Sequence, residues 1–345
     1  MKNIKVLVLV ITLVLGPFFY TLEPFICHCT DFFVALANIP LVKLDPNYVK
    51  LNPNFISGFS DGESSFMVTL KRNKNYKIGW QIQPVFSIEL HNRDISLLYK
   101  IQSFFGVGNI RIVQTRDTVV FSVIKIKDLT NVIIPHFLEY SLRTQKQSDF
   151  LLFKSIVDLM NKGEHLTIEG LTKIVSIRAS MNLGLTEGLK EAFPNITPID
   201  RPKVEAQEII DPYWLVGFTE AEGCFDVKVV ESKTHKIGYQ IMIRLTLTQH
   251  IRDWELMNKL QHNLACGIVY KSPESYVVRL TVTKMSDLFS KIIPLFQKHP
   301  LQGTKRLDFE DFCKVAQIIK IKGHLTAEGL KEIKIIKSGM NRGRK

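Results

Sequence analysis

The spacing of apolar residues changes from helical to alternating at two places in the chain. The stretches from Pro53 to Phe66 and from Pro212 to Phe225 each open with a proline at the first helical position, followed by apolar residues at helical spacing. After the acid near the end of each stretch, apolar and polar residues alternate, as they do over residues 66–71 and 225–230. Each stretch therefore predicts a short helix that leads directly into a half-buried β-strand.

The two predicted helices carry the marks of a close contact with each other. Asn52 and Asp211 precede them as N-cap residues. Small residues stand four positions apart on one face of each helix, which lets another backbone approach. Because glycine in a helix costs roughly 1 kcal/mol relative to alanine, a close contact must compensate. These small residues are Gly58 and Gly62 in the first helix, and Gly217 and Ala221 in the second.

Further alternating runs complete a sheet in each half. Strict alternation predicts antiparallel strands that turn apolar side chains toward helices and polar side chains outward. An order of helix, strands and then helices is an α+β plan. The further strands are expected at residues 81–90, 109–113 and 119–124, then at 240–248, 268–271 and 276–282, and closing helices at 148–160 and 308–321.

The second half of the chain repeats the first at a constant offset. Adding 159 to Glu63 gives Glu222, and the same shift takes Lys146 to Lys305 and Met181-Asn182 to Met340-Asn341. This internal duplication predicts a monomer with pseudo-two-fold symmetry. We expect a first domain at residues 47–185, a proline-containing linker at 186–210 and a second domain at 211–345.

Residues 1–46 differ from the rest and are excluded from the predicted fold. Val6 to Leu22 is uncharged and almost wholly apolar. Such a segment fits a signal peptide, a membrane span or an incidental leader, so that membrane contact through residues 1–46 stays open.

Each predicted helix ends in an acid, Glu63 or Glu222. A carboxylate at a helix C-terminus opposes the helix dipole, and two such acids repel each other if the helices pair. A rule broken twice at equivalent places points to function. A divalent cation between the acids would relieve the conflict, and oxygen ligands suit Mg²⁺. The alternative is a pair of surface acids at helix ends.

The repeated stretch resembles a family signature. Residues 56–64 (I-S-G-F-S-D-G-E-S) and 215–223 (L-V-G-F-T-E-A-E-G) are similar to the paired motifs of the LAGLIDADG homing endonucleases, and the chain looks like the single-chain, two-motif type of fungal mitochondrial introns. The resemblance covers about residue 47 to the C-terminus. Ser64 departs from the family, which usually has glycine there, so the strand geometry after the first acid is in question. Proteins of this family are often translated in frame with an upstream host exon, so the resemblance implies an exon-derived leader.

The resemblance implies a fold, a site and a location. It implies two domains of like fold, each with an antiparallel DNA-binding sheet backed by helices, and a monomeric mitochondrial enzyme that cuts double-stranded DNA to leave short 3′ overhangs. Glu63 and Glu222 become the metal-binding catalytic acids, with Mg²⁺ as cofactor. The family places basic residues near the scissile phosphates, and Lys146 and Lys305 are the candidates, with a structural or DNA-backbone role as the alternative for each.

The outward sheet faces and the charge of the chain fit a DNA partner. Lys and Arg exceed Asp and Glu by 12, and no single basic block holds the excess. A ribbon of about 9 residues spans roughly 30 Å, long enough to follow about 9 base pairs in a major groove. Each outward residue taken alone is equally an ordinary solvated strand residue. The candidates for DNA binding are Ser65, Met67, Thr69, Lys71, Gln81, Gln83, Ser87, Asn109, Arg111, Asp226, Lys228, Gln240, Arg244, Thr246, Thr248 and Lys271.

The cysteines and two histidines suggest no other site, while two rival functions stay open. The five cysteines form no C-x-x-C pair, so they suggest neither a zinc site nor a disulfide framework. His165 and His324 favour helix-entry structure, with Thr167 and Thr326 as caps. The main rival function is an intron RNA maturase that binds RNA without cutting DNA, which needs neither acid. A DNA-binding regulator with a decayed site is a third hypothesis.

Overall fold

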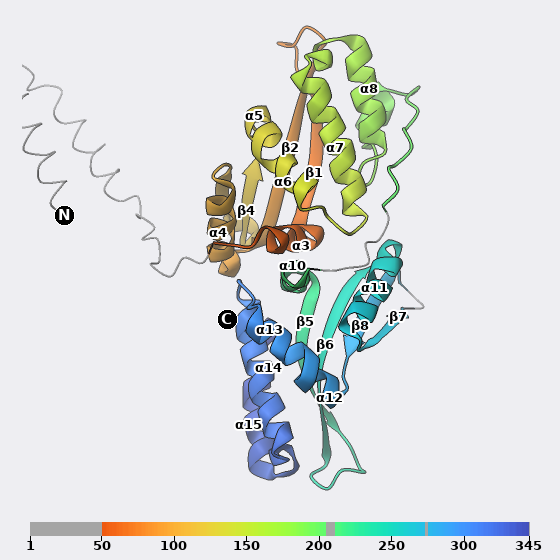
Figure 1. Cartoon of the computed structure of the whole chain (residues 1–345). Coiled ribbons are helices and arrows are strands. Elements are labelled where there is room, and N and C mark those ends of the chain that lie inside the picture. Colours follow the sequence, from red (N-terminus) through yellow and green to blue (C-terminus); the bar gives the residue numbers. More distant parts are fainter. Residues whose placement is uncertain (1–49, 205–210, 273–274, 345) are drawn as a thin grey trace, which may run out of the picture. The chain divides into compact units, whose positions relative to one another are not determined.

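The computed structural model describes residues 50–204, 211–272 and 275–344. This part of the chain consists of two similar halves (Figure 1). Each half has one four-stranded antiparallel sheet with helices on one face, which confirms the predicted α+β plan. Residues 1–46 lie outside the described ranges. Within those ranges, each helix is too short or too polar to cross a bilayer.

The repeated stretches form the helices α3 (Pro53–Glu63) and α10 (Pro212–Glu222). Both predicted N-caps are confirmed, because the Asn52 side chain accepts a hydrogen bond from the Asn54 amide and the Asp211 side chain accepts one from the Tyr213 amide, each at 2.8 Å. Each proline stands at the start of its helix, where its missing N–H costs nothing.

Helices α3 and α10 pack against each other through their small residues (Figure 1). A Cβ atom added to Gly58 would lie 1.9 Å from the Trp214 carbonyl oxygen, and one added to Gly217 would lie 2.1 Å from that of Phe55. The two backbones therefore touch where the glycines stand, and the predicted pairing of the helices is confirmed.

The sheets have matching topology. In the first half the strand order is β1-β2-β4-β3, and in the second it is β5-β6-β8-β7. Every adjacent pair is antiparallel, with registers such as Thr69 opposite Gln83 and Asp226 opposite Arg244. The strands are β1 (Ser64–Arg72), β2 (Trp80–His91), β3 (Asn109–Val113), β4 (Thr118–Val123), β5 (Gly223–Glu231), β6 (Tyr239–His250), β7 (Ile268–Lys271) and β8 (Val277–Val282).

The core of each half lies between one sheet face and its helices. Phe66 packs against Phe86 of β2 and against Phe150 and Phe153 of one helix, and Phe225 takes the same place in the second half. Burial alternates along the strands, so the other sheet face stays open. The main covering helices are α4 (Ile95–Phe105), α6 (Ile134–Glu139), α7 (Lys146–Asn161) and α8 (Ile168–Ala179), then α11 (Trp254–Leu264), α13 (Ile293–Lys298), α14 (Lys305–Lys320) and α15 (Ala327–Ser338).

The predicted threonine caps after the two histidine-containing turns are confirmed. Thr167 accepts a hydrogen bond from the Gly170 amide at the start of α8, and Thr326 accepts one from the Gly329 amide at the start of α15. His165 and His324 stand in the short turns just before these caps.

The segment predicted as an extended linker contains one short helix, α9 (Glu187–Ala192), and then runs without regular structure to residue 204. It lies against the first half, because the Phe193 and Trp80 rings are in contact and Arg201 forms an ion pair with the buried Asp149. Proline content indicated an extended chain here, but it could not show that the chain packs on a neighbouring surface.

Candidate active site

The two acids stand where α3 and α10 end side by side. Glu63 is the last residue of α3 and Glu222 is the last residue of α10. A Cβ atom at Gly62 would lie 3.2 Å from a carboxylate oxygen of Glu222, so the side chain from one half reaches the helix end of the other. The pseudo-two-fold packing thus brings together the two acids that the sequence singled out.

Both carboxyl groups are harder to ionise than an ordinary glutamate. Desolvation raises the pKa of Glu63, and the nearby Lys305 and Lys146 oppose that shift. Desolvation also raises the pKa of Glu222, and the negative charge of Glu63 raises it further. The predicted repulsion between the acids is therefore present, and a cation between them would relieve it.

The two candidate lysines lie directly behind the acids. Lys146 Nζ donates hydrogen bonds to the carbonyl oxygens of Ser60 and Gly62 at 2.9 and 2.8 Å. Lys305 Nζ donates to the carbonyl oxygens of Thr219 and Ala221 at 3.1 and 3.2 Å. Each lysine therefore caps the C-terminal turn of the helix that carries the acid of its own half.

This arrangement explains how the chain tolerates an acid at each helix end. The ammonium groups neutralise the exposed carbonyl oxygens that would otherwise repel the carboxylates. Desolvation lowers the pKa of Lys146 to about 8 and also lowers that of Lys305, while the surrounding carboxylates oppose the shift. The two carboxyl groups and the two lysine ammonium groups therefore lie close together in a poorly solvated region between the halves.

The oxygen donors fit a hard divalent cation in part. Among the described residues, no cluster of three or more His, Cys, Asp or Glu side chains forms a complete metal cage. Mg²⁺ is usually held by one or two carboxylates together with water and substrate phosphate oxygens. Burial raises the pKa of both Glu63 and Glu222, and the charge of Glu63 raises that of Glu222 further, so the two acids match that kind of incomplete site.

Sequence reasoning missed a second pair of acids, two residues before the first. Asp61 is buried and accepts hydrogen bonds from the Arg143 and Thr144 amides and from the Trp214 indole nitrogen at 2.8–3.0 Å. Glu220 accepts from the Gln302 and Gly303 amides at 2.7 and 3.1 Å. These acids hold the loops that lead into the lysines. Their signal in the sequence was an acid at the same position of both repeated stretches.

The departure at Ser64 leaves the strand regular. Strand β1 begins at Ser64 in extended conformation, and its hydroxyl donates to the Ser60 carbonyl oxygen at 2.7 Å. In the second half a Cβ atom at Gly223 would lie 2.5 Å from both the γ-methyl group and the carbonyl oxygen of Thr219. Residue 60, the counterpart of Thr219, is a serine without that methyl group, so one of these two contacts is missing in the first half.

The open sheet faces carry all but one of the candidate DNA-binding residues. The partners in register, such as Ser65 with Ser87 and Lys71 with Gln81, stand on the face that the helices leave uncovered. Lys271 is the exception. It pairs with the buried Val278 and its ammonium lies 4.4 Å from the centre of the Trp254 ring, on the helix side of the edge strand β7. Four residues were too few for alternation to assign its face.

Several outward side chains already have partners on the sheet. Arg244 forms a salt bridge with Asp226 at 2.9 Å, so these two candidates neutralise each other in part. The side-chain oxygen Oε1 of Gln81 accepts a hydrogen bond from the Asn73 side chain. Sequence reasoning missed Arg279, which stands opposite Thr248 on the same open face.

Comparison with known proteins agrees with this fold and site. A model of the LAGLIDADG endonuclease family matches residues 56–157 and 215–316. "Probable intron-encoded endonuclease 3" of Neurospora crassa is 40% identical over 290 residues, which make up 84% of this chain and 54% of that protein. "Probable intron-encoded endonuclease 2" of the same fungus is 38% identical over 301 residues, 84% of this chain and 65% of that protein. The chain thus spans between half and two thirds of these curated relatives.

Solved structures match this chain over nearly their whole own length. Meganuclease I-SmaMI bound to uncleavable DNA is 42% identical with a TM-score of 0.83, covering 86% of this chain and 99% of that chain. The I-LtrWI LAGLIDADG homing endonuclease bound to target DNA is 38% identical with a TM-score of 0.83, covering 85% and 98%. I-SmaMI has also been solved with calcium ions and as a variant with two lysines changed to alanine. The chain belongs to the LAGLIDADG endonuclease family.

Proposed function

We propose that the chain is a site-specific DNA endonuclease that hydrolyses both strands of a long, asymmetric duplex site as a monomer. The observation that carries the proposal is the pair of acids, Glu63 and Glu222, at the junction of two open polar sheet faces. A duplex that follows both faces passes this junction, so its two strands meet the acids there. The DNA-bound state of the similar I-SmaMI and I-LtrWI structures supports this partner.

Glu63 and Glu222 hold divalent metal in this proposal, with Mg²⁺ as the physiological ion. When bound, such an ion activates water and stabilises the charge that develops on the scissile phosphate. The similar I-SmaMI, solved with uncleaved DNA in the presence of calcium ions, supports the involvement of a divalent metal. The acids contribute the oxygen ligands, and a cation between them offsets the repulsion by which the charge of Glu63 raises the pKa of Glu222.

Lys146 and Lys305 keep the acids in place and add positive charge beside the phosphates. Their hydrogen bonds to the final carbonyl oxygens fix the helix ends that carry the acids. The two lysines changed in the I-SmaMI variant are as far apart in its sequence as Lys146 and Lys305 are here, which supports a matching role.

The relatives named as intron-encoded endonucleases support an intron as the origin of the chain, and a relative named as a mitochondrial protein supports mitochondria as its location. The rival maturase function needs neither acid, whereas both acids and both lysines are assembled here. Contact of residues 1–46 with a membrane stays a prediction from their apolar sequence.

The test is cleavage of a supercoiled plasmid that carries the joined exons flanking the host intron, with and without Mg²⁺. We expect linear product with short 3′ overhangs only when the metal is present. An intact plasmid, together with splicing of the intron RNA assisted by the same preparation, would replace the nuclease proposal with the maturase.

A further inference from the structure

We propose that each half of the molecule positions the active-site lysine of the other half, through Asp253 for Lys146 and through Asp94 for Lys305. This inference rests on the proposed nuclease function and adds two positioning residues to it. Both aspartates stand just before a covering helix, Asp94 before α4 and Asp253 before α11, and the 159-residue offset makes them equivalent.

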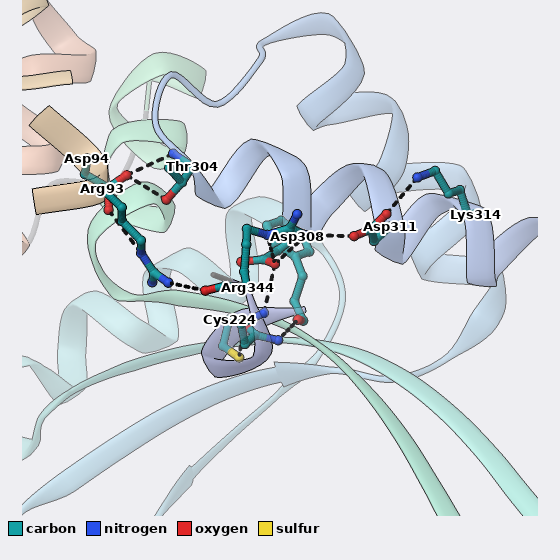
Figure 2. A network of polar contacts seen from close by, with 10 residues as sticks. Arg93, Asp94, Cys224, Thr304, Asp308, Asp311, Lys314 and Arg344 are labelled. Atoms are coloured by element: carbon teal, nitrogen blue, oxygen red, sulfur yellow. Dashed lines mark hydrogen bonds and ion pairs between the residues drawn. The ribbon is translucent and has the colours of Figure 1, made fainter. Parts of the chain in front are cut away.

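The contacts cross between the halves in both directions. Asp253 of the second half accepts a hydrogen bond from the Gln145 amide of the first at 2.7 Å. Asp94 of the first half accepts hydrogen bonds from the Thr304 amide and hydroxyl of the second at 3.0 and 2.7 Å (Figure 2). Gln145 and Thr304 are the residues immediately before Lys146 and Lys305.

These aspartates act as helix caps supplied by the other half. Gln145 and Thr304 are the N-cap residues of α7 and α14, and neither caps its own helix with its side chain. The first amides of a helix need acceptors, and a carboxylate there also interacts favourably with the helix dipole. Asp253 and Asp94 provide that acceptor, and Asp253 is buried while it does so.

Each loop before a lysine is therefore held from two sides. Asp61 holds the first loop from its own half, and Asp253 holds its last residue from the other half. Glu220 and Asp94 do the same for the second loop. Since the lysine is the first residue of its helix, the crossed cap fixes the turn from which its ammonium reaches the carbonyl oxygens behind the acid.

A crossed cap has a consequence that an ordinary stability contact lacks. Loss of Asp253 frays the turn of Lys146 alone, and loss of Asp94 frays the turn of Lys305 alone. In a pseudo-two-fold site the two lysines serve opposite DNA strands, so each loss should slow one strand and spare the other. A misplacement of about 1 Å can reduce a rate by up to roughly a hundredfold.

The experiment compares Asp253→Ala and Asp94→Ala on the supercoiled joined-exon plasmid and on duplexes labelled on either strand. We expect each variant to accumulate nicked plasmid, with nicks on opposite strands and the second cut slowed by roughly tenfold to a hundredfold. DNA affinity in Ca²⁺ should stay within about twofold of the parent, since neither aspartate stands on the open sheet faces.

Matched variants distinguish the loss of the acceptor oxygen from the loss of negative charge and from the loss of packing. Asp253→Asn and Asp94→Asn keep an acceptor oxygen and should cut both strands nearly as the parent does. Arg93→Ala removes the contact to the Arg344 carbonyl oxygen and the ion pair with Asp94 at 3.7 Å, but it keeps the Asp94 carboxylate that accepts from Thr304, so it should produce no strand bias (Figure 2). If Asp253→Ala unfolds, the more exposed Asp94→Ala still has to nick a single strand.

Nicks on the same strand in both variants, equal slowing of both strands, or asparagine variants as impaired as the alanine ones would overturn the inference. Hydrogen exchange keeps it apart from the nuclease proposal. Asp253→Ala should speed exchange of the Gln145 amide, and Asp94→Ala that of the Thr304 amide, whether or not the parent cuts the plasmid. A parent that fails to cut refutes the proposed function, whereas unchanged exchange refutes the crossed caps.

Discussion

At the residue scale, the acids separate cleavage from binding. Glutamine in place of Glu63 or Glu222 keeps the shape of the helix end but removes a proposed metal ligand and a negative charge next to the proposed DNA partner. We expect either variant to lose cleavage of the supercoiled plasmid and to keep, or slightly increase, gel-shift affinity in Ca²⁺. Full cleavage by either variant would refute the metal role, and unfolding with loss of binding would make the acid structural.

A second residue-scale feature is a buried histidine in the first half only. The Ser57 hydroxyl oxygen lies 3.3 Å from His136 Nε2, whereas the equivalent residues of the second half are Val216 and Leu295. Desolvation lowers the pKa of His136 to about 4 from its ordinary 6.5. Between these values the unfolded chain binds the proton and the folded chain does not, so stability falls as the pH drops through this window.

His136→Leu should remove that acid sensitivity, since leucine already stands at the equivalent place. The parent should lose about 2 kcal/mol of unfolding free energy through this histidine between pH 7.5 and pH 5, and the variant should lose that much less. Urea unfolding at both pH values measures the difference. An identical loss in parent and variant would show that His136 does not control the acid response.

At the scale of elements, the contact between α3 and α10 gives a matched pair of glycines. A Cβ atom added to Gly58 would lie 1.9 Å from the Trp214 carbonyl oxygen, whereas one added to Gly188 in α9 would have no atom within 4 Å. Gly58→Ala should therefore force the helices apart and cost about 1–3 kcal/mol. Gly188→Ala should be neutral or stabilise by up to about 1 kcal/mol. Thermal unfolding of both variants is the measurement, and a harmless Gly58→Ala would contradict the close pairing.

The start of each first strand provides a test of compensation. Gly223→Ser should destabilise, because its Cβ would lie 2.5 Å from both the γ-methyl group and the carbonyl oxygen of Thr219. Adding Thr219→Ser removes the methyl group and recreates the combination that the first half already contains in Ser60 and Ser64, so it should restore part of the loss. A double-mutant cycle by urea unfolding gives the coupling, expected at about 0.5–3 kcal/mol. Additive single effects would mean that the methyl group is not the obstacle.

The same elements show how far the sequence could lead. Alternation located the strands and assigned faces correctly in long strands such as β2, because every second side chain was visibly apolar. It failed for Lys271, in a strand of four residues. The acids and lysines were found because duplication repeats them. The acceptor roles of Asp61 and Asp253 could not be found, since their partners lie 82 and 108 residues away and apolar periodicity does not encode which backbone amide a carboxylate meets.

At the scale of the whole molecule, the two open faces differ in how their charges are paired. The second face contains the Arg244–Asp226 salt bridge at 2.9 Å. At the equivalent positions of the first face are Val85 and Met67, which carry no charge. Two faces with different donors and acceptors read different base sequences, which is consistent with a target whose two halves are unlike each other.

Arg244 is the residue on which this asymmetry is best tested. Its guanidinium keeps free donors beside the salt bridge, and arginine recognises guanine by paired hydrogen bonds. Arg244→Ala should weaken the preference for one base at a single target position by about 1–3 kcal/mol. Gel shifts with a set of single-base target variants measure this preference. Because the single change leaves Asp226 unpaired beside DNA, Arg244→Ala/Asp226→Ala separates lost recognition from new repulsion. If Arg244→Ala instead weakened binding to all base variants equally, and lowered the slope of log affinity against log salt concentration by about 1, Arg244 would be a phosphate contact.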